Sequence, residues 1–264
     1  MEVKKLKIAL LTAGLGAEKF ERAAKRVIDA STRLYECDEL LVLRVNNLER
    51  YCPVTAQRYR EFLKPEIRGF GYWIWKPEFI YRTLSGEFGR FDQVIWVDSG
   101  CEINVNRISK AIFARRIRKT DEKGFWFHAL STSDYQYSKR SVISQFPELS
   151  EEQLKSPQIQ ANYMHLSTHS ALPLAEEWFT CATTKISNTN LEFMDNENPT
   201  FIEHRSDQSI LSLSAKKLRL QYNDINLPDG RSLRSVFRGI SEPIWISRNR
   251  DGKSLIPKLI RLIP

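Results

Sequence analysis

The first residue that could do chemistry is an aspartate at the end of an apolar run. The run Val94-Ile95-Trp96-Val97 has the pattern of a strand buried on both faces, and Asp98-Ser99-Gly100 follows it. Ligands of open α/β sheets bind beyond the carboxyl ends of the strands, so this position predicts that Asp98 faces a bound molecule. An ordinary turn explains the same residues equally well, because Asp, Ser and Gly are common in turns.

A second candidate lies upstream, in the segment 68–77, Arg-Gly-Phe-Gly-Tyr-Trp-Ile-Trp-Lys-Pro. Its glycines and aromatic residues favour a loop whose backbone comes close to a ligand, and Pro77 predicts the start of a helix. A helix N-terminus attracts anions and repels a lysine, so Lys76 at this position favours anion binding. For the tryptophans, a hydrophobic plug under the sheet is an equally good interpretation.

The third candidate is the segment 203–209, Glu-His-Arg-Ser-Asp-Gln-Ser, which opens a helix whose apolar residues continue through Leu213. A single histidine is more often packed or exposed than a metal ligand, but Asp207 and Gln208 nearby give His204 more weight. Asp207 also has a simpler explanation, as a negative charge in the first turn of a helix, worth about 0.3–1 kcal/mol.

These candidates need a sheet to hold them, and the hydrophobic pattern predicts one. A strand at 7–13, a helix at 18–31 and a strand at 40–45 form a β-α-β unit with a right-handed crossover. The glycines after the first strand do not complete G-x-G-x-x-G and no G-K-[ST] is present, so neither a dinucleotide-binding fold nor a P-loop is supported. Further helices are predicted at 55–63, 107–119, 139–146, 150–155 and 170–185, and further strands at 124–129, 159–166 and 218–222.

Length and pattern favour one mixed α/β domain. A chain of 264 residues, 42% of them hydrophobic, buries a large core and suits one large domain or two small ones. The sequence shows no internal repeat and no low-complexity tract. We therefore expect a domain at 1–230, with a mostly parallel sheet covered by helices on both faces, and a basic tail at 231–264.

Composition excludes some classes of protein. No apolar run reaches the roughly eighteen residues of a transmembrane helix, and residues 1–5 lead into a strand without the apolar core of a secretory signal. We therefore expect a cytoplasmic protein. The cysteines form no C-x-x-C pair and have no histidines at zinc-finger spacing, so they are expected to be reduced and mostly structural: Cys37, Cys52, Cys101 and Cys181.

The net charge of +8 is concentrated near the C-terminus. Residues 231–264 carry eight basic and two acidic side chains, a net charge of +6, which leaves +2 for the first 230 residues. This distribution argues against a nucleic-acid-binding protein. The tail interleaves basic and large apolar residues, so it predicts peripheral attachment to the inner face of an anionic membrane. Packing of its leucines and isoleucines onto the body is nearly as good an explanation.

The three candidate segments together resemble a broad family of GT-A-like glycosyltransferases, many of them encoded in polysaccharide gene clusters. The resemblance rests on their order and spacing: Gly71-Tyr72-Trp73-Ile74-Trp75-Lys76-Pro77, Val94-Ile95-Trp96-Val97-Asp98-Ser99-Gly100-Cys101 and His204-Arg205-Ser206-Asp207-Gln208-Ser209. Weaker matches are Tyr137-Ser138-Lys139-Arg140, Gln158-Ile159-Gln160-Ala161 and Glu177-Trp178. Together they cover roughly residues 5–222.

The resemblance implies a GT-A-like fold and the transfer of a sugar from a nucleotide-diphosphate donor to a glycan or lipid-linked acceptor in surface polysaccharide synthesis. It assigns donor binding to these residues: Thr12, Ala13, Arg68, Trp75, Lys76, Asp98, Ser99 and Gly100. In such folds a D-x-D motif holds Mg²⁺ or Mn²⁺ against the two phosphates, and the charge of the leaving diphosphate is thereby neutralised. Here the second aspartate is missing. Asp98 and His204 are the candidate metal ligands, with Arg68 and Lys76 as cationic clamps in the alternative without a metal.

The pair Asp207-Gln208 resembles the D-Q motif of retaining glycosyltransferases related to glycogenin and bacterial galactosyltransferases. By that likeness Asp207 holds sugar hydroxyls or positions the acceptor, and Gln208 stabilises the oxocarbenium-like centre. A retaining outcome is slightly favoured, although an inverting enzyme could use Asp207 as its general base. The alternative function is a catalytically weak sugar-nucleotide or glycan-binding protein on the same fold.

Overall fold

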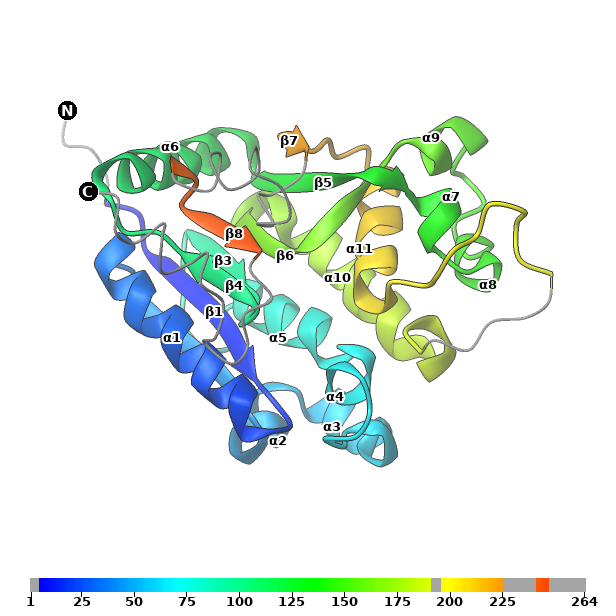
Figure 1. The fold of residues 1–264 in the computed structure, drawn as a ribbon, viewed down its shortest axis with the longest axis horizontal. Coiled ribbons are helices and arrows are strands. Elements are labelled where there is room, and N and C mark those ends of the chain that lie inside the picture. Colours follow the sequence, from blue (N-terminus) through cyan, green and yellow to red (C-terminus); the bar gives the residue numbers. More distant parts are fainter. Residues whose placement is uncertain (1–4, 191–195, 226–240, 247–264) are drawn as a thin grey trace.

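The computed structural model describes residues 5–190, 196–225 and 241–246, and a six-stranded sheet forms its centre (Figure 1). The strand order is β2-β1-β3-β6-β5-β7. Parallel pairs join β1 to β2, β1 to β3 and β5 to β7, whereas β6 runs antiparallel to both β3 and β5. The strands are β1 (Ile8–Gly14), β2 (Glu39–Arg44), β3 (Gln93–Val97), β5 (Phe125–Ser133), β6 (Pro157–Ser167) and β7 (Asp224–Ile225). The predicted mixed, mostly parallel α/β sheet is confirmed.

Two long helices and a small second sheet cover one face of the main sheet. They are α1 (Glu18–Leu34), α6 (Arg107–Lys123) and the antiparallel pair β4 (Cys101–Ile103) with β8 (Ile244–Ile246). Helix α1 presents Val27 and its neighbours at helical spacing to Leu10 and Ile95 of the sheet, and Phe113 of α6 joins the same cluster. Figure 1 shows α1 lying along β1.

Three helices cover the other face, so the prediction of helices on both faces is also confirmed. They are α5 (Trp75–Leu84), α10 (Thr168–Thr184) and α11 (Ser206–Lys217). The core between them and the sheet is continuous and includes Trp96, Phe79, Trp178 and Leu211, each at most 1% exposed. Helices α5 and α11 therefore hold their first turns against the carboxyl end of β3, where a ligand is expected.

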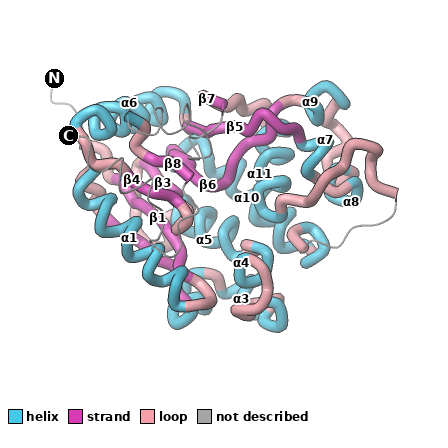
Figure 2. Tube along the Cα trace, viewed as in Figure 1, coloured by secondary structure: helices cyan, strands magenta, loops and turns pink. Residues whose placement is uncertain are grey.

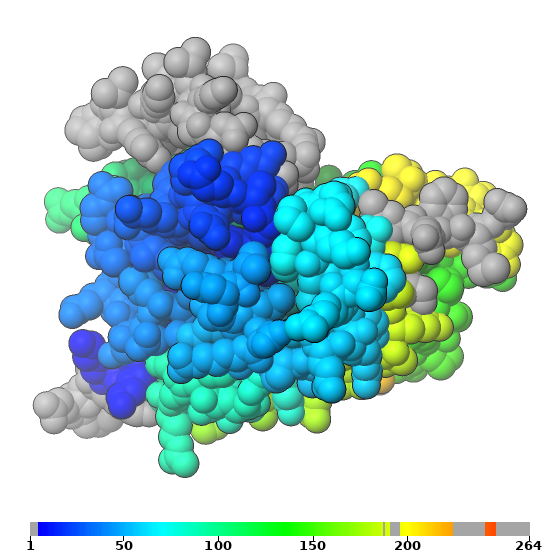
Figure 3. All heavy atoms as spheres, turned by 90° about the horizontal axis from the view of Figure 1, so that it is seen from below, coloured from blue at the N-terminus to red at the C-terminus, as the bar shows by residue number. Residues whose placement is uncertain are grey.

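Short helices and turns connect these elements (Figure 2). They are α2 (Leu48–Tyr51), α3 (Pro53–Arg58), α4 (Gly69–Tyr72), α7 (Asp134–Tyr137), α8 (Arg140–Ile143), α9 (Glu151–Lys155) and 3-10 turns at Val45–Asn47, Arg60–Phe62 and Ile186–Asn188. In the space-filling view, the chain from β1 to α5, coloured blue to cyan, forms most of the visible face (Figure 3). Among the helices of the described residues, none combines the length and apolar character needed to cross a bilayer.

Two elements differ from the sequence expectations. The strand predicted at 218–222 is absent, because Arg219 adopts a left-handed φ of 56° and Leu220 N–H donates to Ala215 O, which closes α11 instead. Residues 241–246, expected in the tail, contain β8 and belong to the fold, since Ile244 and Trp245 are 0% and 2% exposed. The rest of the predicted tail, 231–240 and 247–264, lies outside the described residues.

Candidate functional site

A buried lysine joins two carboxylates at the carboxyl end of β3. Lys76 Nζ lies 3.1 Å from Asp98 Oδ1 and 2.9 Å from Asp207 Oδ2. The three residues come from α5, from the turn after β3 and from α11, so segments far apart in the sequence meet here. We call Asp98, Lys76 and Asp207 the carboxylate–lysine cluster.

Lys76 lies within the first turn of α5, because the helix starts at Trp75 and not at Pro77 as the sequence predicts. Its side chain is 2% exposed, and Nζ also donates to Ala161 O at 3.4 Å. Burial lowers the pKa of Lys76, but the charges of Asp207 and Asp98 outweigh burial and leave this pKa raised. The ammonium is therefore charged at neutral pH, and its three N–H groups are directed at protein oxygens rather than at an external anion.

Asp98 is the most accessible member of the cluster, with 22% of its side chain exposed. Side chains two residues apart along a strand point to the same face of the sheet, so the side chains of Asp98 and Trp96 both point toward α5. Trp96 Nε1 donates to Asp98 Oδ1 at 2.7 Å and Asn162 Nδ2 donates to Oδ2 at 3.1 Å. The carboxylate is thus held by three groups and still reaches the surface.

A bulge in β6 brings Ala161 and Asn162 to the cluster. Along the pairing with β5, Phe127 faces Met164 and Ala129 faces Ile159, so two steps on β5 match five on β6. Bulges of this kind re-aim side chains and are frequent beside active sites. The backbone oxygen of Asn162 also accepts a hydrogen bond from the backbone N–H of Asp98 at 2.8 Å, and this bond fixes the start of the turn.

Asp207 stands in the first turn of α11, directly after Ser206, whose φ of 47° is left-handed. The residue is 4% exposed, and burial raises the pKa of its carboxyl group from 3.8 to about 6, with Lys76 lowering this pKa and Asp98 raising it. Trp178 Nε1 donates to the backbone oxygen of Asp207 at 2.8 Å. The result is an acid that titrates close to neutral pH, as general bases often do.

Gln208 is tied to β6 beside the cluster. Its Nε2 donates to Gln158 Oε1 at 2.9 Å, and Arg205 donates to the same oxygen at 3.2 Å. The Arg205 guanidinium also lies 3.5 Å from the centre of the Tyr137 ring. Two cation or amide donors on one oxygen therefore fix the orientation of the Gln158 and Gln208 side chains.

His204 does not fit the predicted role of a metal ligand. Its Nδ1 accepts the backbone N–H of Lys139 at 3.3 Å, and its Nε2 donates to Asn188 O at 2.8 Å, so both ring nitrogens are engaged. Burial, and then the charge of Lys139, lowers the pKa of His204 to about 3. This histidine is a neutral, packed residue that holds three loops together. Within 5–190, 196–225 and 241–246, no group of three His, Cys, Asp or Glu residues is arranged to hold a metal ion.

The segment before Lys76 forms a left-handed turn. Gly69, Phe70, Gly71, Tyr72 and Trp73 all have positive φ, between 53° and 91°. Consecutive non-glycine residues in this region cost about 1–2 kcal/mol each, and such strain gathers at functional sites. The turn explains the glycines of the motif and delivers Lys76 into the interior.

The tryptophan and arginine of this segment have different surroundings. Trp75 is 4% exposed, and its Nε1 donates to Gly69 O at 3.1 Å, so it is the hydrophobic plug and not an exposed donor-binding residue. Arg68 is exposed, with its guanidinium 5.8 Å from the centre of the Trp73 ring. Arg68 therefore remains free to approach a ligand at the surface.

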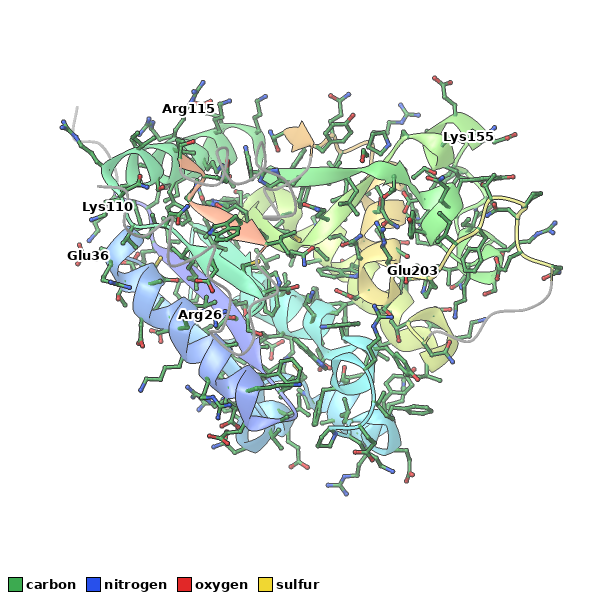
Figure 4. All side chains as sticks on the ribbon, in the orientation of Figure 1. Arg26, Glu36, Lys110, Arg115, Lys155 and Glu203 are labelled. Carbon is green, nitrogen blue, oxygen red and sulfur yellow. The ribbon has the colours of Figure 1, made fainter. Side chains whose placement is uncertain are left out.

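The four small predicted residues fall into two groups. Ser99 and Gly100 lie in the turn beside Asp98, where Arg26 of α1, labelled in Figure 4, donates to Ser99 O at 3.1 Å. A Cβ added to Gly100 would meet no atom of the described residues within 4 Å. Thr12 and Ala13 lie near the end of β1 but point to opposite faces, since Ala13 joins the core on the α5 side. Thr12 Oγ1 is buried and has no hydrogen-bond partner among the residues that the structure describes.

Asn162 is the site residue that the sequence does not reveal. In the sequence Asn162 is a polar residue within the apolar pattern of 159–166. The nearby Gln158 and Gln160 are polar as well, so the sequence does not show that Asn162 is the residue that bonds to Asp98. Only the bulge in β6 decides which of them reaches the cluster.

No protein-family model matches this chain, and no curated protein matches it. Among solved structures, the chain is similar to the crystal structure of mouse xyloside xylosyltransferase 1 in its apo form, with a TM-score of 0.44 and 11% sequence identity. The similarity covers 92% of this chain and 98% of that chain. At this TM-score and identity we infer neither activity nor substrate from it.

Proposed function

We propose that this protein is a glycosyltransferase that uses a nucleotide-diphospho-sugar donor. The observation that carries the proposal is the convergence of Asp98, Lys76 and Asp207 beyond the carboxyl end of β3. Ligands of open α/β sheets bind at this edge. The three converging segments are also those that resemble GT-A-like glycosyltransferases in sequence.

The proposed roles follow from accessibility. Asp98, partly exposed and firmly held, and the open turn at Gly100 contact the donor, with Arg68 as the cation available to its phosphates. Asp207, with a pKa of about 6, serves as the base or as the partner of sugar hydroxyls. Gln208 lies beside the transferred sugar. The acceptor class proposed is a glycan or a lipid-linked sugar.

A thermal-shift screen with UDP-, GDP-, CMP- and dTDP-sugars tests donor binding. A ligand at a hundred times its dissociation constant stabilises a protein by about 2.7 kcal/mol, so one donor should raise the melting temperature visibly. The shift should disappear in Asp98→Ala and persist in Glu18→Ala, whose side chain is 80% exposed on α1. No shift with any donor would reject the proposal.

A second candidate function is binding of a sugar nucleotide without turnover. It is favoured by the small exposed fraction of the Asp207 side chain, 6%, which limits contact with an acceptor. Transfer or donor hydrolysis that disappears in both Asp98→Ala and Asp207→Ala supports the enzyme. Retained donor binding without turnover on any acceptor supports the binding protein.

A further inference from the structure

The carboxylate–lysine cluster already contains its own cation. Two acids and one ammonium share a site in which Lys76 is 2% exposed and Asp207 is 4% exposed. Asp98 is only partly exposed, and two carboxylates that approach each other at such a largely buried site are stabilised by a positive charge between them. In many nucleotide-sugar sites a divalent ion supplies that charge, and here a side chain of the chain itself stands between the acids.

The oxygens around Lys76 are of the type that a hard divalent cation would use. They are a carboxylate oxygen of Asp98 at 3.1 Å, a carboxylate oxygen of Asp207 at 2.9 Å and the backbone oxygen of Ala161 at 3.4 Å. Carboxylate and carbonyl oxygens are the ligands that Mg²⁺ and Mn²⁺ prefer. All three contact the ammonium.

Lys76 is also fixed in place. Its Nζ lies 5.3 Å from the centre of the Trp96 ring, and the same indole donates to Asp98. A metal ion bound to Asp98 would have to share this carboxylate with the ammonium, and like charges repel strongly at a buried site. His204, the other predicted ligand, has both ring nitrogens engaged.

We propose that the Lys76 ammonium permanently occupies the cation position between Asp98 and Asp207, so that these two carboxylates work without a divalent metal. This inference deepens the proposed function and rests on it for the nature of the ligand. Lys76 is then a positioning residue. Its ammonium favours the ionised form of both acids and holds their carboxylates close together in a fixed orientation, and it does not contact the phosphates.

Mn²⁺ binding to the full chain, followed by electron paramagnetic resonance of the free ion, tests the proposal without any turnover. Wild type and Asp98→Asn should bind Mn²⁺ equally weakly. Lys76→Met should bind Mn²⁺ about tenfold or more tightly than wild type, because it frees two facing carboxylates. Adding Asp98→Asn to Lys76→Met should abolish the gain.

Lys216→Met is the matched control. Lys216 is likewise buried, at 8% exposed, and pairs with Asp134, but its removal frees one carboxylate and not two. It should gain no Mn²⁺ binding. Circular dichroism of each variant verifies the fold, and the comparison of wild type with Asp98→Asn holds even where Lys76→Met does not fold.

The two proposals fail in different ways. Saturable Mn²⁺ binding by wild type that Asp98→Asn removes would overturn the internal cation, even with donor binding intact. Absence of gain in a folded Lys76→Met would overturn it as well. Unchanged weak Mn²⁺ binding together with no thermal shift for any nucleotide sugar would leave the internal cation standing and reject the proposed function.

Discussion

The raised pKa of Asp207 should make the free energy of unfolding depend on pH. Burial raises the pKa of Asp207 from 3.8 to about 6, so between these pH values the folded state binds more protons than the unfolded state. The free energy of unfolding therefore falls as the pH rises from 4 to 6, by about 2 kcal/mol from this group. Urea unfolding of wild type and Asp207→Asn across this range measures it, because asparagine does not titrate.

Only the difference between the two proteins is diagnostic, since ordinary carboxylates titrate in the same range. The wild-type curve should decline relative to that of Asp207→Asn as the pH rises. Parallel curves would mean that the carboxyl group of Asp207 has an ordinary pKa, and its role as a base near neutral pH would lose its support.

The positions of the two acids can be predicted from the sequence, whereas the partners of the lysine cannot. Asp98 and Asp207 stand at the end of a buried strand and at the start of a helix, which a local pattern can detect. Lys76 was expected to face an anion at a helix N-terminus. Its true partners come from positions 22 and 131 residues later, and no local pattern encodes which carboxylates meet it.

The left-handed turn at 69–73 predicts an unequal response to alanine. Gly71 and Gly86 have nearly equal φ, 91° and 89°. A Cβ on Gly71 would lie 2.9 Å from Leu63 Cδ2 and 3.2 Å from Phe62 O, whereas a Cβ on Gly86 would meet, among the described residues, only Gly89 O at 3.9 Å. Gly86→Ala should cost about 1 kcal/mol, for the strained φ. Gly71→Ala should cost about 1–3 kcal/mol more, for the overpacking.

Chemical denaturation gives both values, and the pair shares the same φ, so their difference isolates the contact with 62–63. Equal losses would show that the turn relaxes easily. In that case its strain would not serve to hold Lys76 in the interior.

Glu78 of α5 caps the N-terminus of helix α3, so its removal should lower the free energy of unfolding. Its two carboxylate oxygens accept the backbone N–H groups of Val54 and Thr55, at 2.9 and 2.8 Å, in the first turn of α3. Glu78 is 0% exposed, so Glu78→Ala leaves the buried N–H of Thr55 and the partly buried N–H of Val54 unpaired and should cost about 1–3 kcal/mol. The matched change Glu49→Ala, at a side chain 78% exposed, should cost at most about 0.5 kcal/mol by the same denaturation assay.

The elements that sequence predicts well are those with a long, regular pattern. The first strands and α1, α6 and α10 appear near their predicted positions, because periodicity over many residues outweighs local exceptions. The strand expected at 218–222 fails at one residue, Arg219, whose left-handed φ closes a helix where glycine is usual. The bulge in β6 depends on pairing with β5, which a single segment does not encode.

At the scale of the molecule, the described C-terminal segment completes the face that carries α1 and α6. Strand β8 pairs antiparallel with β4, Ile246 opposite Cys101, and Arg116 of α6 forms an ion pair with Glu242. Asn104 donates two further hydrogen bonds to this segment, from its side-chain amide to Glu242 O at 2.8 Å and from its backbone N–H to Pro243 O at 2.9 Å. Strand β4 begins directly after the turn that contains Asp98. The pairing of β8 with β4 therefore stabilises the chain on the C-terminal side of that turn.

Two truncations separate this supporting role from the proposed membrane role of the tail. Removal of 241–264 takes away Ile244 and Trp245, 0% and 2% exposed, and should lower the free energy of unfolding by about 4 kcal/mol or more. Removal of 247–264 leaves β8 in place, so it should cost less stability than removal of 241–264. It deletes five basic residues, which at about 1 kcal/mol each near an anionic surface amount to about 5 kcal/mol of membrane attraction.

Flotation with vesicles of phosphatidylcholine and phosphatidylserine then measures the second effect. The full chain should float with anionic vesicles and stay behind with neutral ones, and the chain ending at Ile246 should stay behind with both. Salt should weaken flotation, because the attraction is screened over about 8 Å at physiological ionic strength. Flotation that survives removal of 247–264 would place the membrane contact on the body of the molecule, where exposed basic residues of α6 such as Lys110 and Arg115 become the next variants to test.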